Sequence, residues 1–258
     1  MSANFAPPNP AHKASFLEII GSITPAFFKS MKMIANGRIP LKETISKAAL
    51  ISYESLPMIL ILIVIGTSIL TLNTSIELVK QGGRDLIGPL IVLANLREMV
   101  PVFIAFGLAA RCGTAFTSEV SVMQVTEQID VLKVLKIDPL YYLLVPALLS
   151  VMIMMPFVLA ISSVISVFAG MTVAKLAVDL EMIEFLDSAW KLVEIKDYIL
   201  PLIKIEIFAI FCILVHIVMG LKCEGGAKEV GMTTTKATAI VIMGVIIMDG
   251  ILTPLLYL

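Results

Sequence analysis

The stretch LPMILILIVIGTSILTL, residues 56–72, contains no charged side chain and is apolar at almost every position. A helix that crosses a lipid bilayer needs about 20 mainly apolar residues to span roughly 30 Å of hydrocarbon. Residues 51–55 before this stretch and residues 73–84 after it are polar or charged at several positions. The sequence therefore predicts a membrane-spanning helix here, and this prediction decides the class of fold.

The composition of the whole chain agrees with this interpretation. Of its 258 residues, 59% are hydrophobic and only 15% are charged, whereas soluble domains carry about 25% charged residues. We therefore expect an all-α integral membrane protein. The net charge of −1 does not favour nucleic acid binding. The three cysteines, Cys112, Cys212 and Cys223, are too few and too scattered to predict a disulfide framework or a zinc site.

Four further apolar blocks follow the first. The predicted spans are residues 56–76, 86–111, 139–174, 198–221 and 237–258. The third block has 36 residues without a charge, which would measure about 54 Å as a single helix. It is either one long span that projects beyond the bilayer or a tight hairpin, and the sequence leaves both open.

The N-terminal part of the chain has a different character. Residues 1–15 contain three prolines and no apolar core, which predicts a disordered tail. Residues 16–50 mix apolar side chains with lysines, a pattern typical of an amphipathic helix lying in the membrane interface. The alternative for this region is a sixth, poorly apolar span.

The distribution of lysine and arginine predicts the orientation. If the N-terminus is cytoplasmic and there are five spans, twelve of these cations fall in cytoplasmic segments and five in outer segments. This bias matches the positive-inside rule and places the C-terminus outside. A hairpin in the third block would move the lysines of residues 222–236 outside, so the charge distribution argues against it.

The segment VTEQIDVLKVLKIDP, residues 125–139, connects the second and third predicted spans and contains several charged residues. Val122, Val125, Ile129 and Leu132 recur at helical spacing and mark one face, while Glu127 and Asp130 lie together on another. The Asp138-Pro139 pair ends the helix. We predict a cytoplasmic helix over residues 119–136 whose apolar ridge and acidic flank suit a protein partner. The alternative is a solvated connector.

Several ionisable residues fall inside the predicted spans. They are Arg97, Glu98, Lys204, Glu206 and Asp249. A charge at bilayer depth costs several kcal/mol unless it is paired or hydrated. These residues therefore indicate either interhelical ion pairs that hold the bundle or a polar binding site.

Catalytic signatures are weak. The two histidines are His12 in the tail and His216 in an apolar span, and neither belongs to a cluster with metal-ligand spacing or to a Ser–His–Asp arrangement. We expect His216 to be a hydrogen-bonded core residue. The sequence contains no GxxxxGK[ST] phosphate-binding loop, so this chain does not hydrolyse ATP by that route.

Two regions carry a specific set of motifs. Residues 96–146 read LREMVPVFIAFGLAARCGTAFTSEVSVMQVTEQIDVLKVLKIDPLYYLLVP, and residues 225–237 read GGAKEVGMTTTKA. The sequence closely resembles the MlaE-type permeases of MCE lipid transporters over roughly residues 45–258. The matching positions are Arg97, Glu98, Pro101, Arg111, Gly113, Ala115, Glu119, Met123, residues 126–130, Asp138 and Pro139. Departures from the usual pattern occur at Ala110, Val120, Ser121 and Ala147.

The resemblance implies that residues 51–258 form a permease domain, half of a homodimeric transporter in the bacterial inner membrane. Its implied cargo is phospholipid, exchanged with a periplasmic, hexameric MCE-domain protein. It also implies a separate cytoplasmic ATPase that binds the ATP, and a small STAS-domain protein bound to that ATPase. On this basis the chain is not an enzyme and holds no cofactor or metal.

The resemblance also implies roles for individual residues. The charged cytoplasmic helix becomes a coupling helix that docks on the ATPase. Its expected contacts are Glu127, Gln128, Ile129, Asp130 and Leu132. The expected lipid site consists of Arg97, Glu98, Lys204 and Glu206, with Leu70 and Leu255 lining the acyl chains. In this site Arg97 and Lys204 would receive a phosphate and Glu98 would orient them.

Two other functions are compatible with a polytopic membrane protein. A secondary transporter is expected to contain internal repeats with broken helices at matching positions, and no repeat is visible in this sequence. An intramembrane lipid-modifying enzyme would need an acid–base pair at the membrane interface. Both remain alternatives to the permease prediction at this point.

Overall fold

The computed structural model describes residues 16–37 and 39–257, with side chains from residue 21 onward. The predicted disordered tail, residues 1–15, lies outside the described residues. Within the described part the chain is helical, with no strand. Its helices are α1 Phe16–Ala35, α2 Leu41–Leu50, α3 Leu56–Lys80, α4 Ile87–Ala94, α5 Val100–Leu108, α6 Thr114–Val125, α7 Gln128–Val134, α8 Val145–Val178, α9 Met182–Trp190, α10 Lys196–Leu221 and α11 Ala227–Tyr257.

Short turns of other helix types join several of these elements into longer helices. The π-helical turns are η1 Ile51–Ser55, η3 Asn95–Met99, η4 Ala109–Gly113 and η5 Leu140–Leu144, and η2 Arg84–Leu86 is a 3₁₀ turn. The described chain then has five helices long and apolar enough to cross a membrane: Leu41–Lys80, Arg84–Val125, Leu140–Val178, Lys196–Leu221 and Ala227–Tyr257. The predicted all-α fold with five spans is confirmed.

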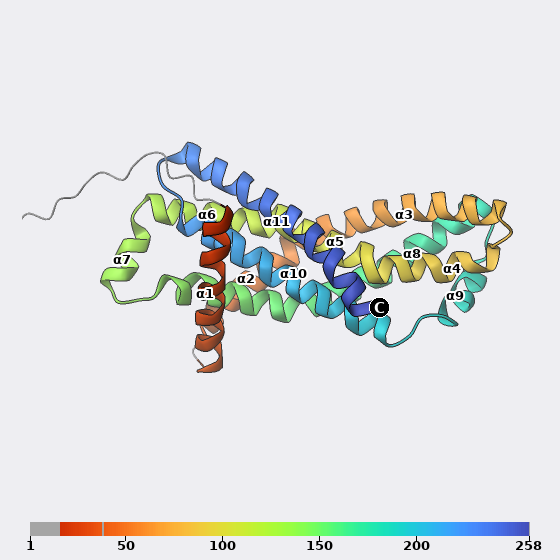
Figure 1. Cartoon of the computed structure of the whole chain (residues 1–258), viewed down its shortest axis with the longest axis horizontal. Coiled ribbons are helices and arrows are strands. Elements are labelled where there is room, and N and C mark those ends of the chain that lie inside the picture. The colour runs from red at the N-terminus through yellow and green to blue at the C-terminus, as the bar shows by residue number, and fades with distance from the viewer. Residues whose placement is uncertain (1–15, 38, 258) are drawn as a thin grey trace, which may run out of the picture.

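The helices extend well beyond the predicted spans. The second runs on to Val125 and the fifth begins at Ala227, because hydropathy marks only the part of a helix that meets hydrocarbon. The predicted interfacial region, residues 16–50, is divided. Helix α1 lies across the long axes of the spans (Figure 1). After a turn in which Gly37 has a φ of 71°, α2 begins and continues through η1 into α3.

The third apolar block forms one helix and not a hairpin. Helix α8 runs unbroken for 34 residues and packs along α3. Pro146 directly follows the π-helical turn η5, and Pro156 lies inside the helix. At about 51 Å, α8 is longer than the roughly 30 Å hydrocarbon layer. The far ends of α3, α4 and α8 accordingly extend past the C-terminal end of α11 (Figure 1).

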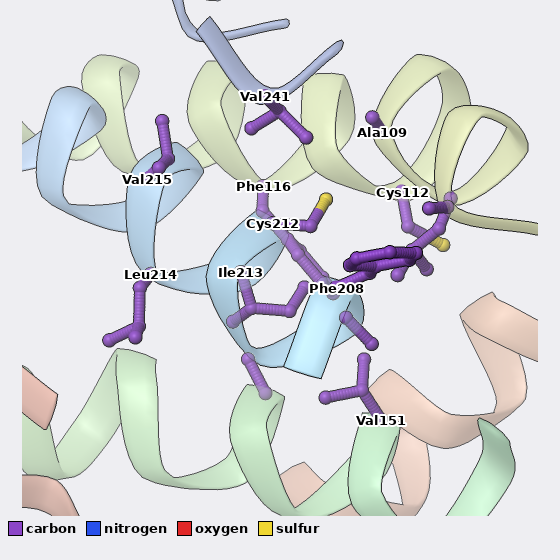
Figure 2. Packing of buried hydrophobic residues seen from close by; sticks show 14 of the residues in the cluster. Ala109, Cys112, Phe116, Val151, Phe208, Cys212, Ile213, Leu214, Val215 and Val241 are labelled. Carbon is purple, nitrogen blue, oxygen red and sulfur yellow. The ribbon is translucent and has the colours of Figure 1, made fainter. Parts of the chain in front are cut away.

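Helix α10 lies at the centre of the bundle. Its side chains pack against residues of α5, η4, α6, α8 and α11 (Figure 2). The labelled members of this core are Ala109, Cys112, Phe116, Val151, Phe208, Cys212, Ile213, Leu214, Val215 and Val241. By contrast, most of the apolar surface of α3 and α11 is exposed in the single chain.

A second, smaller core lies at the far end of the bundle, where α9 packs on α4. Phe185 of α9 is fully buried there. Gly88 of α4 permits this contact, because a Cβ atom at residue 88 would lie 2.3 Å from the carbonyl oxygen of Phe185. The sequence analysis did not anticipate α9, which is short and lies between two charged segments.

Each end of the bundle has an exposed residue at which labelling can test the topology. Helix α7 lies at one end and α9 at the other (Figure 1). Asp187 of α9 and Lys228 at the start of α11 are both exposed. In a variant lacking the three native cysteines, Asp187→Cys is expected to react with a membrane-impermeant thiol reagent added outside intact cells. Lys228→Cys is expected to react only after lysis, and labelling of both in intact cells would contradict the five-span topology.

Candidate functional site

Lys204, in the first half of α10, is the centre of a buried polar cluster. Its side chain is 0% exposed. Its ammonium group donates to the carbonyl oxygen of Arg97 at 2.8 Å, to Glu98 Oε2 at 3.0 Å and to Thr253 Oγ1 at 3.0 Å. Asp249 Oδ1 lies 2.6 Å away. An ammonium group has three protons, so these four contacts use its full donor capacity.

Glu98 is the accessible member of this cluster. Its side chain is 36% exposed, although one oxygen contacts Lys204. Thr253 Oγ1 lies 3.1 and 3.2 Å from its two carboxylate oxygens. Glu98 thus has a fixed orientation and a face open to a ligand.

Arg97 points to a different partner. Its Nε and one terminal nitrogen each lie 2.7 Å from Asp197 Oδ1. The other oxygen of Asp197 accepts the backbone N–H of Glu194 at 2.9 Å. The guanidinium carbon lies 4.8 Å from the centre of the Tyr257 ring, within the range of a cation–π contact. The Arg97 side chain keeps 30% of its surface exposed.

Local chain geometry explains why this cluster forms here. Arg97 and Glu98 lie in the π-helical turn η3, and such turns are frequent at functional sites. Pro101 follows four residues after Arg97 and has no N–H to donate to its carbonyl. Lys204 supplies the missing donor. The four-residue spacing of Arg97 and Pro101 therefore leaves the Arg97 carbonyl oxygen free inside the bundle to accept a hydrogen bond from Lys204.

The predicted lipid-site residues are brought together only in part. Lys204 contacts Glu98, whereas the Arg97 side chain pairs with Asp197, and it is the backbone carbonyl of Arg97 that accepts from the Lys204 ammonium. Glu206 lies two residues after Lys204 and therefore points about 200° away from it around α10. Its Oε2 is buried and has no hydrogen-bond partner among the described residues. Leu255 is exposed on α11 and Leu70 is partly buried on α3.

Three residues of the cluster were not predicted from the sequence: Asp197, Thr253 and Tyr257. A signal for two of them was available, because Asp249, Thr253 and Tyr257 are spaced four apart and so lie along one face of α11. Asp197 had no such signal. Its partner Arg97 is 100 residues away in the sequence, and only the packing of α10 against η3 joins them.

The charged segment between the second and third spans is not the single helix predicted over residues 119–136. Helix α6 ends at Val125 and α7 begins at Gln128. Between them Glu127 has a φ of 60°, a left-handed conformation that is uncommon outside glycine. Helix α7 consequently turns away from the axis of α6 at the end of the molecule (Figure 1).

This turn also reverses the predicted apolar face of α7. Ile129 is buried and Leu132 is partly buried, so the predicted ridge packs inward. The exposed apolar side chains of α7 and its end are Val131, Val134 and Leu135, and Val134 is 81% exposed. We call these three residues the α7 patch. Glu127 and Asp130 are exposed beside it, and Asp130 pairs with Lys133 at 2.7 Å.

Other polar groups of the bundle have structural partners. His216 is fully buried, and its Nδ1 lies 2.7 Å from Thr117 Oγ1, as expected of a core histidine. In the part of the chain that the structure describes, no group of three or more histidine, cysteine or acidic residues is arranged to hold a metal ion. The Lys204 cluster and the α7 patch are therefore the candidate functional sites of the described structure.

Comparison with known proteins gives a consistent result. The family described as permease MlaE matches residues 44–255. The chain is 30% identical over 226 residues to a probable ABC transporter permease protein of Pyropia yezoensis, covering 88% of this chain and 86% of that protein. It is 29% identical over 224 residues to one of Synechocystis, covering 87% and 85%. It is 28% identical over 219 residues to the chloroplast protein TRIGALACTOSYLDIACYLGLYCEROL 1 of Arabidopsis thaliana, covering 85% of this chain and 63% of that protein.

Proposed function

The chain belongs to the MlaE permease family, and from that premise we propose that it is the phospholipid-conducting subunit of an MCE-type lipid transporter. It works in the bacterial inner membrane, with the N-terminus in the cytoplasm and the C-terminus in the periplasm. The observation that carries the proposal is the Lys204 cluster, a set of paired charges inside the helical bundle in which Arg97, Glu98 and Asp249 stay partly exposed.

The cluster has the chemistry to bind a phospholipid headgroup. Arg97 offers a planar guanidinium, which suits phosphate oxygens, and Glu98 offers a carboxylate. The cluster contains three carboxylates, from Glu98, Asp197 and Asp249, against two cations. A zwitterionic headgroup fits the positions of the two exposed charges: its phosphate binds Arg97 and its ammonium binds Glu98. Lys204 holds Glu98 in position from behind.

The acyl chains of such a lipid need an apolar lining. Leu255 follows Thr253 closely on α11 and is exposed, and Leu70 lies on the long apolar helix α3. We assign both to the acyl-chain path. Glu206 is left outside the proposed site, because no contact in the described structure joins it to the cluster. The plant relative, named for the lipid trigalactosyldiacylglycerol, supports lipid as the class of cargo.

A permease of the ABC type works with an ATPase partner, and we propose that this partner binds at α7. The α7 patch is apolar, exposed and flanked by Glu127 and Asp130. Anionic lipid surfaces attract lysine and arginine, so this acidic flank fits a protein partner better than the membrane. Ile129 and Leu132 pack on the inner side of α7, and Gln128 is exposed beside Glu127. The STAS-domain protein then contacts the ATPase and not this chain.

Two further partners complete the proposal. The chain is half of a homodimer, consistent with the wide apolar surfaces that α3 and α11 expose in the single chain. The MCE-domain protein binds at the α9 end, which projects beyond α11 on the side opposite α7 (Figure 1). The family argues against a secondary transporter, and the described residues offer no observation that favours a lipid-modifying enzyme.

Co-purification tests this function. The chain is expressed with the ATPase and MCE-domain proteins of its own gene neighbourhood and recovered by an affinity tag, and bound ATPase and phospholipid are quantified. Glu127→Lys with Asp130→Lys is expected to lower ATPase recovery about tenfold or more, since juxtaposed like charges cost several kcal/mol at an interface. Phospholipid content is expected to stay the same, because the Lys204 cluster is remote from α7.

The matched control is Glu181→Lys with Glu184→Lys, the same charge reversal on exposed residues at the α9 end. It is expected to leave ATPase recovery unchanged. If the α7 variant also keeps normal ATPase recovery, α7 is only a connector. Recovery of the wild-type chain with neither an ATPase nor phospholipid would overturn the proposed function itself.

A further inference from the structure

A cavity lies at the α7 end of the bundle, away from the Lys204 cluster. Its volume is about 380 Å³, within the range of about 300–1,000 Å³ that is usual for small-molecule sites. Four elements enclose it: α1, the α6–α7 segment, the start of η5 and the end of α10. Its lining residues are Ser22, Pro25, Ala26, Lys29, Gln124, Ile129, Lys133, Pro139, Leu140, Val218, Leu221 and Lys222.

The charged residues of this cavity all have one sign. Lys29, Lys133 and Lys222 come from α1, α7 and the end of α10, and none of the lining residues is acidic. Two of the lysines are held by carboxylates outside the lining: Lys29 by Asp138 and Lys133 by Asp130. Lys222 donates to Ser22 Oγ at 2.8 Å. The three ammonium groups therefore border the cavity, and the carboxylates of Asp130 and Asp138 contact two of them from outside its lining.

The rest of the lining is mostly apolar. Ala26, Ile129, Leu140, Val218 and Leu221 contribute hydrocarbon surface. Three of these five, Ala26, Ile129 and Val218, are buried members of the main core. A ligand that fits must therefore combine a negative group with an apolar body.

The position of the cavity restricts the ligand further. Helix α1 forms one wall and lies across the spans (Figure 1), as a helix in the headgroup region of a membrane does. The cavity is thus level with the headgroups of one leaflet. Lys222 follows Lys204 by 18 residues on α10, roughly 27 Å along the helix, so the two sites cannot hold the same headgroup.

We propose that this cavity binds one anionic phospholipid of the leaflet on the α7 side. Its phosphate and any second negative group contact the three lysines, and the beginning of an acyl chain lies against Ala26, Leu140 and Leu221. The lipid contacts both α1 and α7, and so joins the membrane interface to the segment that carries the α7 patch. This site goes beyond the proposed transport function and does not depend on it, because its ligand is a resident lipid and not cargo.

Photolabelling of the full-length chain in lipid nanodiscs tests the site. The discs contain phosphatidylcholine with a small fraction of phosphatidylglycerol that carries a diazirine in one acyl chain, or the same fraction of labelled phosphatidylcholine. Peptide mass spectrometry locates the labelled residues. We expect phosphatidylglycerol to label the segments around Pro25–Lys29, Pro139–Leu140 and Val218–Lys222 several-fold more than phosphatidylcholine does. Unlabelled phosphatidylglycerol should compete, whereas inorganic phosphate should not.

The charge of the lysines is tested with a matched pair of variants. A lysine near an anionic headgroup changes binding about fivefold, so Lys29→Gln with Lys222→Gln is expected to reduce labelling of the cavity by roughly tenfold or more. The control, Lys32→Gln with Lys228→Gln, removes two exposed lysines of α1 and α11 that do not line the cavity. It is expected to label like wild type. Labelling of the lipid-exposed face of α8, at Phe157 and Ile161, serves as the internal standard.

Three results would overturn the proposal. Equal labelling by the two lipids would mean that the cavity is filled by bulk lipid without selection. Unchanged labelling in the Lys29→Gln, Lys222→Gln variant, with its circular dichroism and size-exclusion profile intact, would exclude the lysines as the binding groups. Absence of label from the cavity, with α8 labelled normally, would mean that another occupant, such as a segment of the chain or a partner, fills it. None of these results bears on transport.

Discussion

The Lys204→Ala variant is expected to unfold at a markedly lower temperature and to lose most of its co-purified phospholipid. Removing the ammonium leaves the carboxylates of Glu98 and Asp249 without the cation between them, and leaves the Arg97 carbonyl without its donor. Breaking a buried ion pair by removing one partner costs roughly 3–5 kcal/mol. The thermal unfolding midpoint and the phospholipid phosphorus per mole of protein measure the two effects.

A control on the same helix separates the buried cluster from surface charge. Lys196 of α10 pairs with Glu194 at 3.0 Å, but both side chains are more than half exposed. Exposed pairs contribute about 0–1 kcal/mol, so Lys196→Ala is expected to unfold and bind lipid like wild type. A Lys204→Ala protein with normal stability and normal lipid content would contradict the assigned role of the cluster.

A compensated variant distinguishes scaffold from binding site. In Lys204→Met combined with Glu98→Gln and Asp249→Asn, neutral side chains of similar size replace all three charges. Removing all three charges together leaves none of them unpaired, so part of the stability lost in Lys204→Ala is expected to return. Lipid content is expected to stay low, because Glu98 no longer offers a carboxylate to the headgroup. If lipid content and transport both return in full, the cluster is only structural.

The Gly113→Ala variant is expected to destabilise the bundle core, although it adds only one methyl group. A Cβ atom at residue 113 would lie 2.3 Å from His216 Nε2 and 2.4 Å from its Cδ2. The His216 ring is fully buried and held at its other nitrogen by Thr117, so it cannot swing away without losing that hydrogen bond. Overpacking of this kind costs about 1–3 kcal/mol. The expected result is a lower unfolding temperature.

The matched control for this variant is Gly231→Ala in α11, where a Cβ atom would have no neighbour within 4 Å. Alanine is favoured over glycine inside helices by about 1 kcal/mol, so Gly231→Ala should unfold at the same temperature as wild type or higher. A Gly113→Ala protein as stable as wild type would mean that α10 and η4 are farther apart than the structure places them.

The number and type of the long helices could be predicted from the sequence because hydropathy is a local property. The run at residues 56–72 must be buried in lipid or protein whatever else the chain does. The residues at which the helices begin and end could not be predicted from hydropathy. Helix α8 continues through a block where the apolar composition also allowed a hairpin and only the loop charges argued against one. The packing of α3 along α8 favours the single helix.

In the candidate sites, too, some residues could be predicted from the sequence and others could not. The sequence singled out Lys204 and Glu98, because charges in apolar helices are costly and therefore informative. It also singled out the charged segment that became α7. It did not identify Asp197 as the partner of Arg97, and it placed Ile129 and Leu132, which pack inward, among the expected partner contacts of α7. The left-handed turn at Glu127 redirects α7, and no periodicity in the sequence marks that turn.

The sequence by itself determined that this chain is an all-helical membrane protein with five spans, which residues carry charge into the bilayer, and which family it belongs to. Each of these follows from the identity of residues or from short motifs. The tertiary structure alone decided that Lys204 bridges Glu98 and Asp249, that Val131, Val134 and Leu135 are the exposed apolar residues of α7, and that three lysines from separate helices surround one cavity. The physical reason is that these arrangements depend on how distant helices pack and rotate against one another, and side-chain pairing between residues 100 positions apart leaves no periodic signal in a single sequence.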